Sequence, residues 1–279
     1  MSQPRLISVV VPTYNQAEYL GACLDSIMFQ DYPNLELIVI ADPSPDQTSE
    51  VLAEFARAVN QDTVSFASKL EEDGEVSRTT HPRYPQIGRR LVIVENHERL
   101  GHTPSYNRGF ELATGDYCTY VASDDICHPQ WLSEMAAPLD QNEADFVYTD
   151  MFIFDDQGRI LREFKLPDYD FKACFCDWYL CGVSKLYRRQ LHERLGYYDP
   201  GFTANDHECY QRFALGGVRF KHLAKTLYSV RTHEGRQNDV HTAASWKKLL
   251  AESGGLVRQA RAVLDGKLDE ISPSHGVGS

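Results

Sequence analysis

Short apolar runs alternate with amphipathic segments along the first half of the chain. Four runs are rich in β-branched and other apolar residues and are expected to be strands: 6–11, 35–40, 91–94 and 117–121. Three segments between them have the apolar spacing of helices: 17–29, 49–59 and 104–113. Apolar strands connected by helices predict an α/β protein with a mostly parallel central sheet flanked by helices. In such sheets, ligands bind at the carboxyl ends of the strands.

The second half of the chain has a different pattern. Residues 146–154 are expected to form a long strand with a hairpin partner at 159–164. An apolar strand region ends at Val230, and helices are expected near 188–195, at 206–215 and at 246–264. We therefore expect two halves, with the bounds 1–125 and 126–265.

Two stretches lie outside this plan. Residues 60–90 are polar and charged and include Pro82 and Pro85, so we expect a surface insertion there. Residues 266–279 contain few apolar side chains, and we expect them to be a disordered tail.

Composition narrows the classes of function. The chain has 279 residues, with 28 Lys and Arg against 40 Asp and Glu, a net charge of −12 without a basic block. This charge argues against nucleic acid and anionic membrane surfaces as main partners. No apolar stretch reaches the roughly 20 residues of a membrane span, and no signal peptide is recognisable, so we expect a cytoplasmic protein without a transmembrane segment. The seven scattered cysteines are expected to be reduced, buried thiols.

Two adjacent carboxylates, Asp124 and Asp125, closely follow the apolar run 117–121. Like charges at the mouth of a buried strand repel each other and lose hydration, so we expect a cation to hold them. Hard divalent cations take carboxylate oxygens and keep coordination positions open for a phosphate ligand. The alternative is structural, with Asp125 as the cap of a helix that starts near Pro129.

An aromatic residue and short polar residues follow the first strand. A nucleobase could stack on Tyr14 while backbone groups read its edge. The alternative is a strand-to-helix turn with Asn15 as the cap. The segment consists of Pro12, Thr13, Tyr14 and Asn15.

An acidic residue, Asp42, follows the second strand and is suited to accept a hydrogen bond from a nucleobase or a ribose hydroxyl. Asp46 is instead expected to cap the next helix. After the third strand comes a run of small and polar residues that includes Asn107. In this run, Gly101 permits a tight backbone and Gly109 permits a helix to approach the sheet closely.

In this order, these pieces resemble the family 2 glycosyltransferases, which have the GT-A nucleotide-sugar-binding fold. The resemblance spans roughly residues 6–235 and rests on the motifs at 9–15, 36–42, 107–117 and 123–125. It implies an enzyme that moves a sugar, with inversion, from a nucleotide-diphosphate sugar to a hydroxyl-bearing sugar or glycolipid acceptor. The first half would bind the donor, and the second half would bind the acceptor and carry catalysis. A role in polysaccharide biosynthesis is expected by family analogy alone.

The resemblance also implies roles for the residues at the strand ends. Tyr14 would stack on the base, Asp42 would contact the base or ribose, and Asp124 would approach the sugar or ribose. Asp125 would ligate Mn²⁺ or Mg²⁺ on the diphosphate, and His233, after the last strand, would complete that site. The remaining donor-site candidates are Pro12, Thr13, Asn15 and Asn107.

The family places its catalytic acid before a helix in the second half, and this chain has Asp206 at that position. As general base, Asp206 would take the proton of the acceptor hydroxyl while that hydroxyl attacks the anomeric carbon. The alternative role is the N-cap of the helix. Trp178 and Tyr179 lie where the family shapes its acceptor pocket, and Glu208 is a further acceptor-site candidate.

The second half also contains three close cysteines, Cys174, Cys176 and Cys181. Their spacing lacks a Cys-x-x-Cys pair and an obvious fourth ligand, so buried thiols are favoured over a zinc site.

Three departures from the family pattern, at Ala41, Pro43 and Asn205, leave room for a rival function. That rival is a non-catalytic sugar-nucleotide or glycan-binding module of the same fold. A second rival is a sugar-phosphate nucleotidyltransferase. It would need a glycine-rich, basic loop after the first strand, and the chain has none there.

Overall fold

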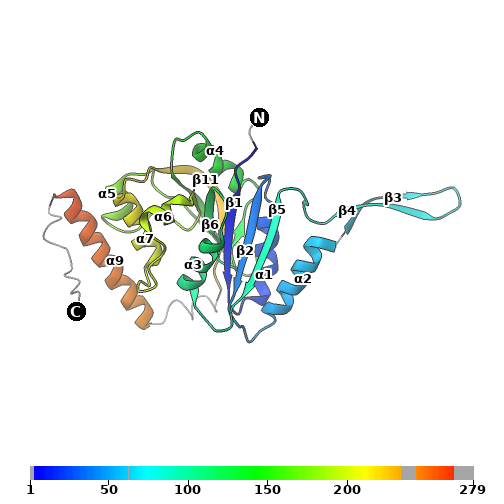
Figure 1. The fold of residues 1–279 in the computed structure, drawn as a ribbon, viewed down its shortest axis with the longest axis horizontal. Helices are drawn as coiled ribbons and strands as arrows, with labels where there is room; N and C mark the ends of the chain where they lie inside the picture. Colours follow the sequence, from blue (N-terminus) through cyan, green and yellow to red (C-terminus); the bar gives the residue numbers. More distant parts are fainter. Residues whose placement is uncertain (1–2, 62, 234–242, 267–279) are drawn as a thin grey trace. The chain divides into compact units, whose positions relative to one another are not determined.

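The computed structural model describes residues 3–61, 63–233 and 243–266. They belong to two compact units, Met1–Glu134 and Met135–Ser279. Figure 1 shows the helices and strands of both units, most of them labelled. The tail expected at 266–279 lies, beyond its first residue, outside the described residues.

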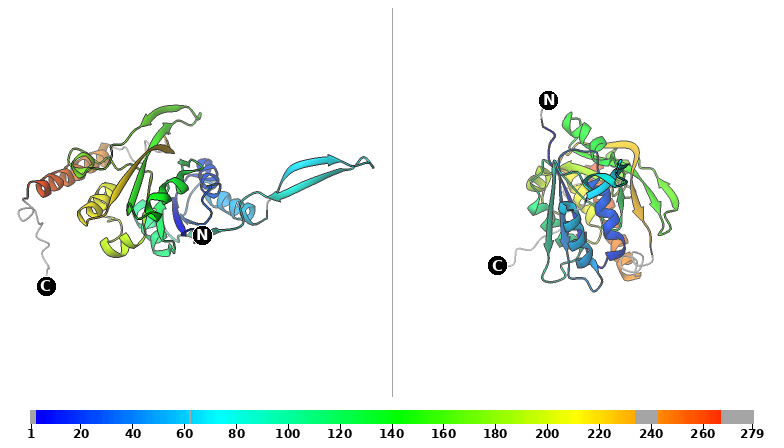
Figure 2. Two further views of the ribbon diagram at one scale, coloured as in Figure 1. Left: turned by 90° about the horizontal axis from the view of Figure 1, so that it is seen from above. Right: turned by 90° about the vertical axis from the view of Figure 1, so that its right-hand side faces the viewer.

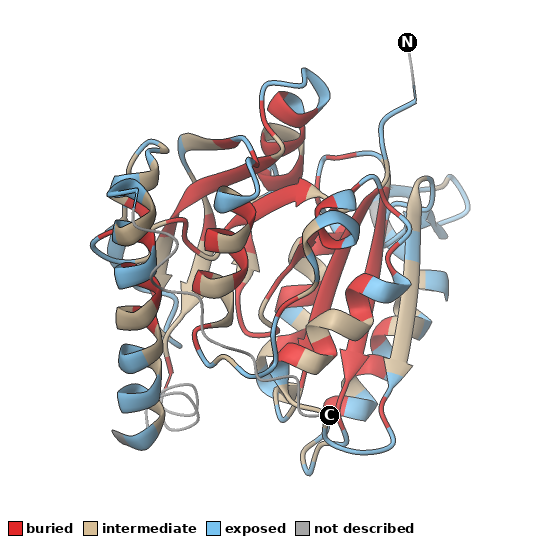
Figure 3. Ribbon diagram, turned by 60° about the vertical axis from the view of Figure 1, so that its left-hand side comes forward, coloured by how far each residue is buried: buried red, intermediate tan, exposed pale blue. Residues whose placement is uncertain are grey.

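Four strands of the first unit form a parallel sheet in the order β5-β2-β1-β6. β1 and β2 are buried along their whole length (Figure 3), because helices cover both faces, and this explains their continuous apolar sequences. The predicted parallel sheet is thereby confirmed. The strands are β1 Ile7–Thr13, β2 Leu35–Ala41, β5 Arg89–Glu95 and β6 Tyr117–Tyr120.

The helices of the first unit lie on both faces of this sheet (Figure 1). α3 packs on β1 and β2, and α1 packs against α2. The close contact of α3 depends on Gly109, because a Cβ atom there would lie 2.2 Å from Cγ1 of Val10. The predicted close approach at Gly109 is therefore confirmed. The elements are α1 Ala17–Met28, α2 Thr48–Gln61, α3 His102–Leu112 and the short strand β7 Ile126–Cys127.

The insertion expected at 60–90 contains a two-stranded antiparallel ribbon, β3 Thr63–Leu70 and β4 Val76–Pro82. Figure 2 shows it extending away from the other elements of the first unit. Its root is fixed by Tyr84, whose ring stacks on Phe29 and whose hydroxyl donates to Oδ1 of Asp25 over 2.5 Å. Sequence analysis missed the strands because their apolar alternation is weak, although the turn contains the hairpin signal Asp73-Gly74.

The second unit is built around the long strand β8, Phe146–Phe154. β10 Lys185–Arg188 and β9 Ile160–Phe164 pair with it antiparallel, and β11 Phe220–Arg231 pairs with it parallel. The predicted hairpin of β8 and β9 is confirmed. The helices are α5 Phe171–Phe175, α6 Gln190–Leu195, α7 Asn205–Leu215 and α9 Ala243–Leu264, and α4 Trp131–Asp140 spans the boundary between the units.

An aromatic core fills the second unit between its strands and helices. The hydroxyls of Tyr187, Tyr198 and Tyr210 form a buried chain, with oxygen–oxygen distances of 3.3 and 2.6 Å. Sequence analysis did not predict β10 and α5. Both are at most five residues long, and β10 contains Lys185, a fully buried charged residue that interrupts the apolar pattern.

All seven cysteines are buried and free of disulfides, which confirms the prediction of buried thiols. Within the described ranges, no helix has the length and apolar character to cross a membrane.

Candidate active site

Backbone hydrogen bonds align the carboxyl ends of three strands in the first unit. The N–H of Asp42 donates to the carbonyl of Thr13 over 3.0 Å, and the N–H of Asn96 donates to the carbonyl of Ala41 over 2.8 Å. Thr13 at the end of β1, Asp42 after β2 and Asn96 after β5 are thus held side by side. They lie at the edge of the sheet that the carboxyl ends of its strands form. The hydroxyl of Thr13 is buried there and has no hydrogen-bond partner in the described part of the chain. A buried polar atom of this kind is suited to a ligand or a bound water.

The carboxylate pair lies at the same edge, in the turn that follows β6. Asp124 and Asp125 are 5% and 1% exposed, and the N–H of Asp125 donates to the carbonyl of Ala122 over 3.0 Å, which closes the turn. The alternative role of Asp125 as a helix cap is wrong, because the residues that follow it form strand β7. α4 begins only at Trp131.

The chemistry of this pair suits a hard divalent cation, because carboxylate oxygens are the preferred ligands of Mn²⁺ and Mg²⁺. Among the residues that the structure describes, no group of three or more His, Cys, Asp or Glu side chains lies close enough to hold a metal ion. An ion bound at this pair would therefore take most of its further ligands from a phosphate-bearing molecule and water.

Tyr14 lies beside the same edge, under an arginine that sequence analysis did not select. The guanidinium carbon of Arg99 is 3.8 Å from the centroid of the Tyr14 ring. Asn15 has a φ of 54°, and its N–H donates to Oγ of Ser44 over 3.0 Å. The alternative role of Asn15 as a helix cap is wrong, because the N-cap of α1 is Gln16.

Asp46 supplies the missing cap. Its Oδ2 accepts from the N–H of Ala17 over 2.9 Å, and its Oδ1 accepts from the N–H of Thr48 over 3.1 Å. The predicted cap of α2 is confirmed, and the same carboxylate also caps α1. Burial raises the pKa of Asp46, but the hydrogen bonds from Thr48 and Ala17 outweigh burial and leave the pKa below its ordinary value.

Asp42 makes two hydrogen bonds within the protein. Nδ2 of Asn96 donates to its Oδ1 over 2.7 Å, and the N–H of Gly101 donates to its Oδ2 over 2.9 Å. Asn96 also accepts a hydrogen bond from Arg108. Gly101 has a φ of 85°, so the predicted tight backbone is confirmed, and α3 begins at the next residue. Asn107 lies half-buried in that helix.

Asp206 lies in the second unit, half-buried in the first turn of α7. The alternative role as N-cap is wrong, because the helix starts at Asn205 and its N-cap is Ala204. The N–H groups of Thr203 and Ala204 donate to Oε2 of Glu252, a residue of α9, over 2.7 and 2.9 Å. Glu252 therefore ties the segment just before α7 to α9.

The two other acceptor-site candidates near α7 differ in their contacts. The ring of Tyr179 stacks on His207 at a centroid distance of 5.4 Å, and its hydroxyl donates to the carbonyl of Gly182. Burial raises the pKa of Tyr179, and the nearby carboxylate of Asp206 adds to this rise. Trp178 is 41% exposed and offers a free aromatic surface. Tyr179 and Asp206 are thus neighbours in the second unit.

Glu208 forms a two-point ion pair with Arg212, with distances of 2.7 Å to Nε and 2.9 Å to Nη2. Arg212 in turn donates to the carbonyl of Tyr197. Through Arg212, Glu208 therefore helps to connect α7 to the segment that follows α6.

His233 is the second residue after β11 and is 9% exposed. The adjacent Thr232 continues the strand ladder, because its N–H donates to the carbonyl of Phe154 over 2.8 Å. The end of the strand therefore holds the backbone beside His233 in place.

Two of the three close cysteines interact with each other. The hydrogen bond from Cys181 lowers the pKa of Cys174 to about 6, and the hydroxyl of Tyr148 lies 3.7 Å from the Cys174 sulfur. The backbone of Cys176 is instead tied to α9, since its carbonyl accepts from Nε of Arg261 over 2.6 Å. These contacts are those of packed thiols.

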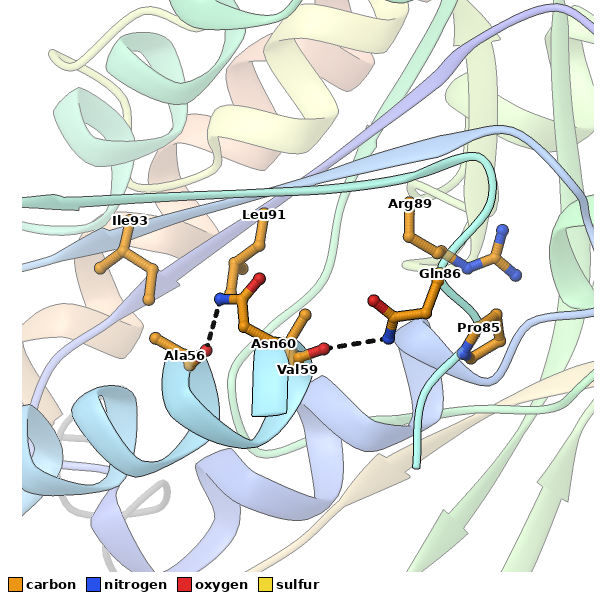
Figure 4. Close-up of a pocket in the computed structure, with 8 residues that line it drawn as sticks. All are labelled: Ala56, Val59, Asn60, Pro85, Gln86, Arg89, Leu91 and Ile93. Atoms are coloured by element: carbon orange, nitrogen blue, oxygen red, sulfur yellow. Dashed lines mark hydrogen bonds between the residues drawn. The ribbon is translucent and has the colours of Figure 1, made fainter. Parts of the chain in front are cut away.

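Figure 4 shows a pocket of about 310 Å³ elsewhere in the first unit, between α2 and the edge strand β5. Hydrogen bonds of Asn60 to Ala56 and of Gln86 to Val59 close part of its wall. None of its lining residues is a candidate site residue. Its lining is Ala56, Val59, Asn60, Pro85, Gln86, Arg89, Leu91 and Ile93.

The model of one protein family, glycosyltransferase like family 2, matches residues 4–204. The chain belongs to this family. The matched range includes the strand ends of the first unit and ends at Ala204, the N-cap of α7.

Several known glycosyltransferases are similar to this family 2 member. The glycosyltransferase GlyA of Streptococcus pneumoniae is 26% identical over 263 residues, a match that covers 88% of this chain and 33% of GlyA. The chain thus spans about a third of the length of that relative. Solved structures of other glycosyltransferases share the fold.

TarS 1–349 of S. aureus in complex with UDP-GlcNAc has a TM-score of 0.65 at 20% identity, with 97% of this chain and 74% of that chain covered. The mannosyltransferase PcManGT of Pyrobaculum calidifontis in complex with GDP-Man and Mn²⁺ has a TM-score of 0.56 at 20% identity, with 96% and 76% covered. The expected GT-A fold is confirmed.

Proposed function

We propose that this family 2 protein is an inverting glycosyltransferase that moves a sugar from a nucleotide-diphosphate sugar to a hydroxyl-bearing sugar or glycolipid acceptor with the help of Mn²⁺ or Mg²⁺. One observation carries the proposal: the buried carboxylates Asp124 and Asp125 share a sheet edge with Asp42 and with the partnerless hydroxyl of Thr13. Nucleotide-sugar complexes of TarS and PcManGT, the latter with Mn²⁺, support this choice of donor and ion.

The first unit would bind the donor. The base stacks on the ring of Tyr14. Its edge faces the backbone of Pro12, Thr13 and Asn15. The carboxylate of Asp42, which keeps lone pairs after its two hydrogen bonds, also accepts from that edge. Asp124 accepts from a hydroxyl of the ribose or sugar. Asn107, half-buried in α3, would contact the same part of the donor.

Asp125 would hold the divalent ion, with His233 as a further ligand through a neutral imidazole nitrogen. When bound, such an ion neutralises charge on the departing diphosphate. Carboxylates on a rigid strand end suit this task, since they need no rearrangement when the substrate arrives.

The second unit would supply the acceptor chemistry. Asp206 removes the proton of the acceptor hydroxyl as its oxygen attacks the anomeric carbon, and the bond to the diphosphate breaks on the opposite side. The exposed ring of Trp178 offers a stacking surface for a sugar, and Tyr179 holds the segment against α7. The proton stays on Asp206 until solvent takes it.

A non-catalytic sugar-nucleotide-binding module of the same fold is the rival function. Asn205 precedes Asp206 in place of the family's usual acid, and Ala41 and Pro43 alter the motif around Asp42. The two functions differ in one readout. The enzyme consumes its donor in a reaction that needs Asp125 and Asp206, whereas the module only binds it.

Calorimetric titration with UDP, GDP, dTDP and CDP, with and without Mn²⁺, tests the proposal. Wild type is compared with Asp125→Asn and with the control Asp116→Ala, which removes an exposed acid paired with Arg5. We expect one nucleotide to bind in a metal-dependent way to wild type and to the control only. If no nucleotide binds to wild type, the donor site and the proposed transferase activity are both wrong.

A further inference from the structure

The contact between Arg99 and Tyr14 affects how a nucleobase can enter the proposed donor site. The guanidinium carbon lies 3.8 Å above the ring centroid, so it covers one face of the ring on which a base would stack. Such a separation is one van der Waals layer. A flat base therefore has no room between the ring and the guanidinium unless Arg99 moves outward.

Arg99 is exposed, and its contact with Tyr14 is its sole interaction within the described ranges of the chain. It has no carboxylate partner there, although the chain carries a net charge of −12. An arginine without an ion pair, held beside an aromatic ring, is suited to a ligand that is both flat and negatively charged. A nucleoside diphosphate has both properties.

The loop that carries Arg99 is fixed at both ends by one side chain. Asn96 donates to Oδ1 of Asp42 over 2.7 Å, and Gly101 donates to Oδ2 over 2.9 Å. The residues between these anchors are exposed or half-buried. The ends of the loop are therefore held in place while the arginine side chain keeps its freedom to move. Asp42 acts here as a positioning residue for Arg99.

We propose that Arg99 moves outward when the donor binds and then stacks on the far face of the base, so that the base is held between Tyr14 and Arg99. This inference rests on the proposed function and deepens it, because it makes Arg99 a determinant of base binding. Planar guanidinium groups stack on the faces of nucleobases, so this contact needs the base and does not depend on the diphosphate.

The test compares a ligand with a base and one without. Dissociation constants are measured in Mn²⁺ for the nucleoside diphosphate that wild type binds and for inorganic pyrophosphate. The variants are Arg99→Ala, Arg99→Lys and the control Arg78→Ala, which removes an exposed arginine from β4. We expect Arg99→Ala to weaken the nucleotide about tenfold and pyrophosphate by less than about twofold.

Arg99→Lys keeps the charge without the planar group, so it should resemble Arg99→Ala with the nucleotide and wild type with pyrophosphate. In Tyr14→Ala, removing Arg99 as well should cost less than it does in wild type, because both side chains act on the same base. The inference is overturned if Arg99→Ala leaves nucleotide affinity unchanged, tightens it, or weakens both ligands equally. If wild type binds no nucleotide, the proposed function fails and the inference fails with it. If wild type binds and Arg99→Ala matches it, only the inference fails.

Discussion

Asp46 accepts a hydrogen bond from the backbone N–H of Ala17 at 2.9 Å, so an acid that follows β2 caps the helix that follows β1. The same carboxylate accepts from the N–H and the hydroxyl of Thr48, at 3.1 and 2.5 Å, at the start of α2. One side chain thus fixes the start of two helices beside the carboxyl ends of β1 and β2.

Replacing Asp46 with alanine is expected to lower the free energy of unfolding by about 1–2 kcal/mol at neutral pH, the usual cost of a lost cap. The pKa of Asp46 is lower in the folded protein than in the unfolded chain, so its contribution is present above the unfolded value and is lost as pH falls through the folded value. Urea unfolding at pH 7 and pH 3 checks both points. An equal loss at both pH values would contradict the role of the ionised carboxylate.

Replacing Asp206 with asparagine should lower kcat by about a hundredfold to ten-thousandfold, the range expected for loss of a general base, and leave donor affinity within about twofold. Glu208→Gln is the matched control, because Glu208 lies in the same helical turn but pairs with Arg212. It should affect thermal stability more than turnover. The proposal for Asp206 fails if turnover survives in Asp206→Asn or if Glu208→Gln alone abolishes it.

Strands that are buried on both faces of the sheet could be predicted from the sequence. β1 and β2 are buried at every position, so their residues form apolar runs that can be recognised without any neighbour. β10 contains the buried Lys185, and β4 is exposed at every position, so no buried face imposes an alternation on it. Elements of that kind depend on tertiary contacts or on local pairing that the apolar pattern does not encode.

For the candidate site, the sequence predicted only that residues at the strand ends lie close together. The rule that parallel strands present their carboxyl ends at one edge places Thr13 and Asp42 together. The bond from Gly101 to Asp42 and the contact of Arg99 with Tyr14 join residues that are distant along the chain. Their side-chain directions depend on the path of a loop, for which sequence spacing provides no signal.

The burial of His192 is expected to make the stability of the protein depend on pH. Burial lowers its pKa to about 4 in the folded protein, whereas an unfolded histidine titrates near 6.5. Its contribution is therefore complete above the unfolded value and declines as pH falls toward 4, by about 1.4 kcal/mol per pH unit. His192→Gln should flatten the dependence of the urea midpoint on pH between 7 and 5. An unchanged slope would show that His192 is not a source of it.

The ribbon β3–β4 should be dispensable for stability. The side chains described on β4 are all exposed, and the root is anchored beyond the ribbon by Tyr84. Thr63 pairs with Pro82, so a short Gly-Ser linker can replace residues 63–82 without stretching the chain. We expect a melting temperature within about 2 °C of wild type in differential scanning fluorimetry. A larger fall would mean that the ribbon contributes to the fold of the first unit.

Replacing glycine with alanine is expected to have opposite effects on stability at Gly109 and at Gly21. Alanine at Gly109 would place its Cβ 2.2 Å from Cγ1 of Val10, so we expect a loss of about 1–3 kcal/mol from overpacking between α3 and β1. Gly21 lies in α1 with no neighbour within 4 Å of an added Cβ, so Gly21→Ala should stabilise the protein by about 0.5–1 kcal/mol. Combining Gly109→Ala with Val10→Ala should restore part of the loss, because the smaller side chain makes room. Equal effects of both glycine substitutions in urea unfolding would show that helix propensity, and not contact with the sheet, governs position 109.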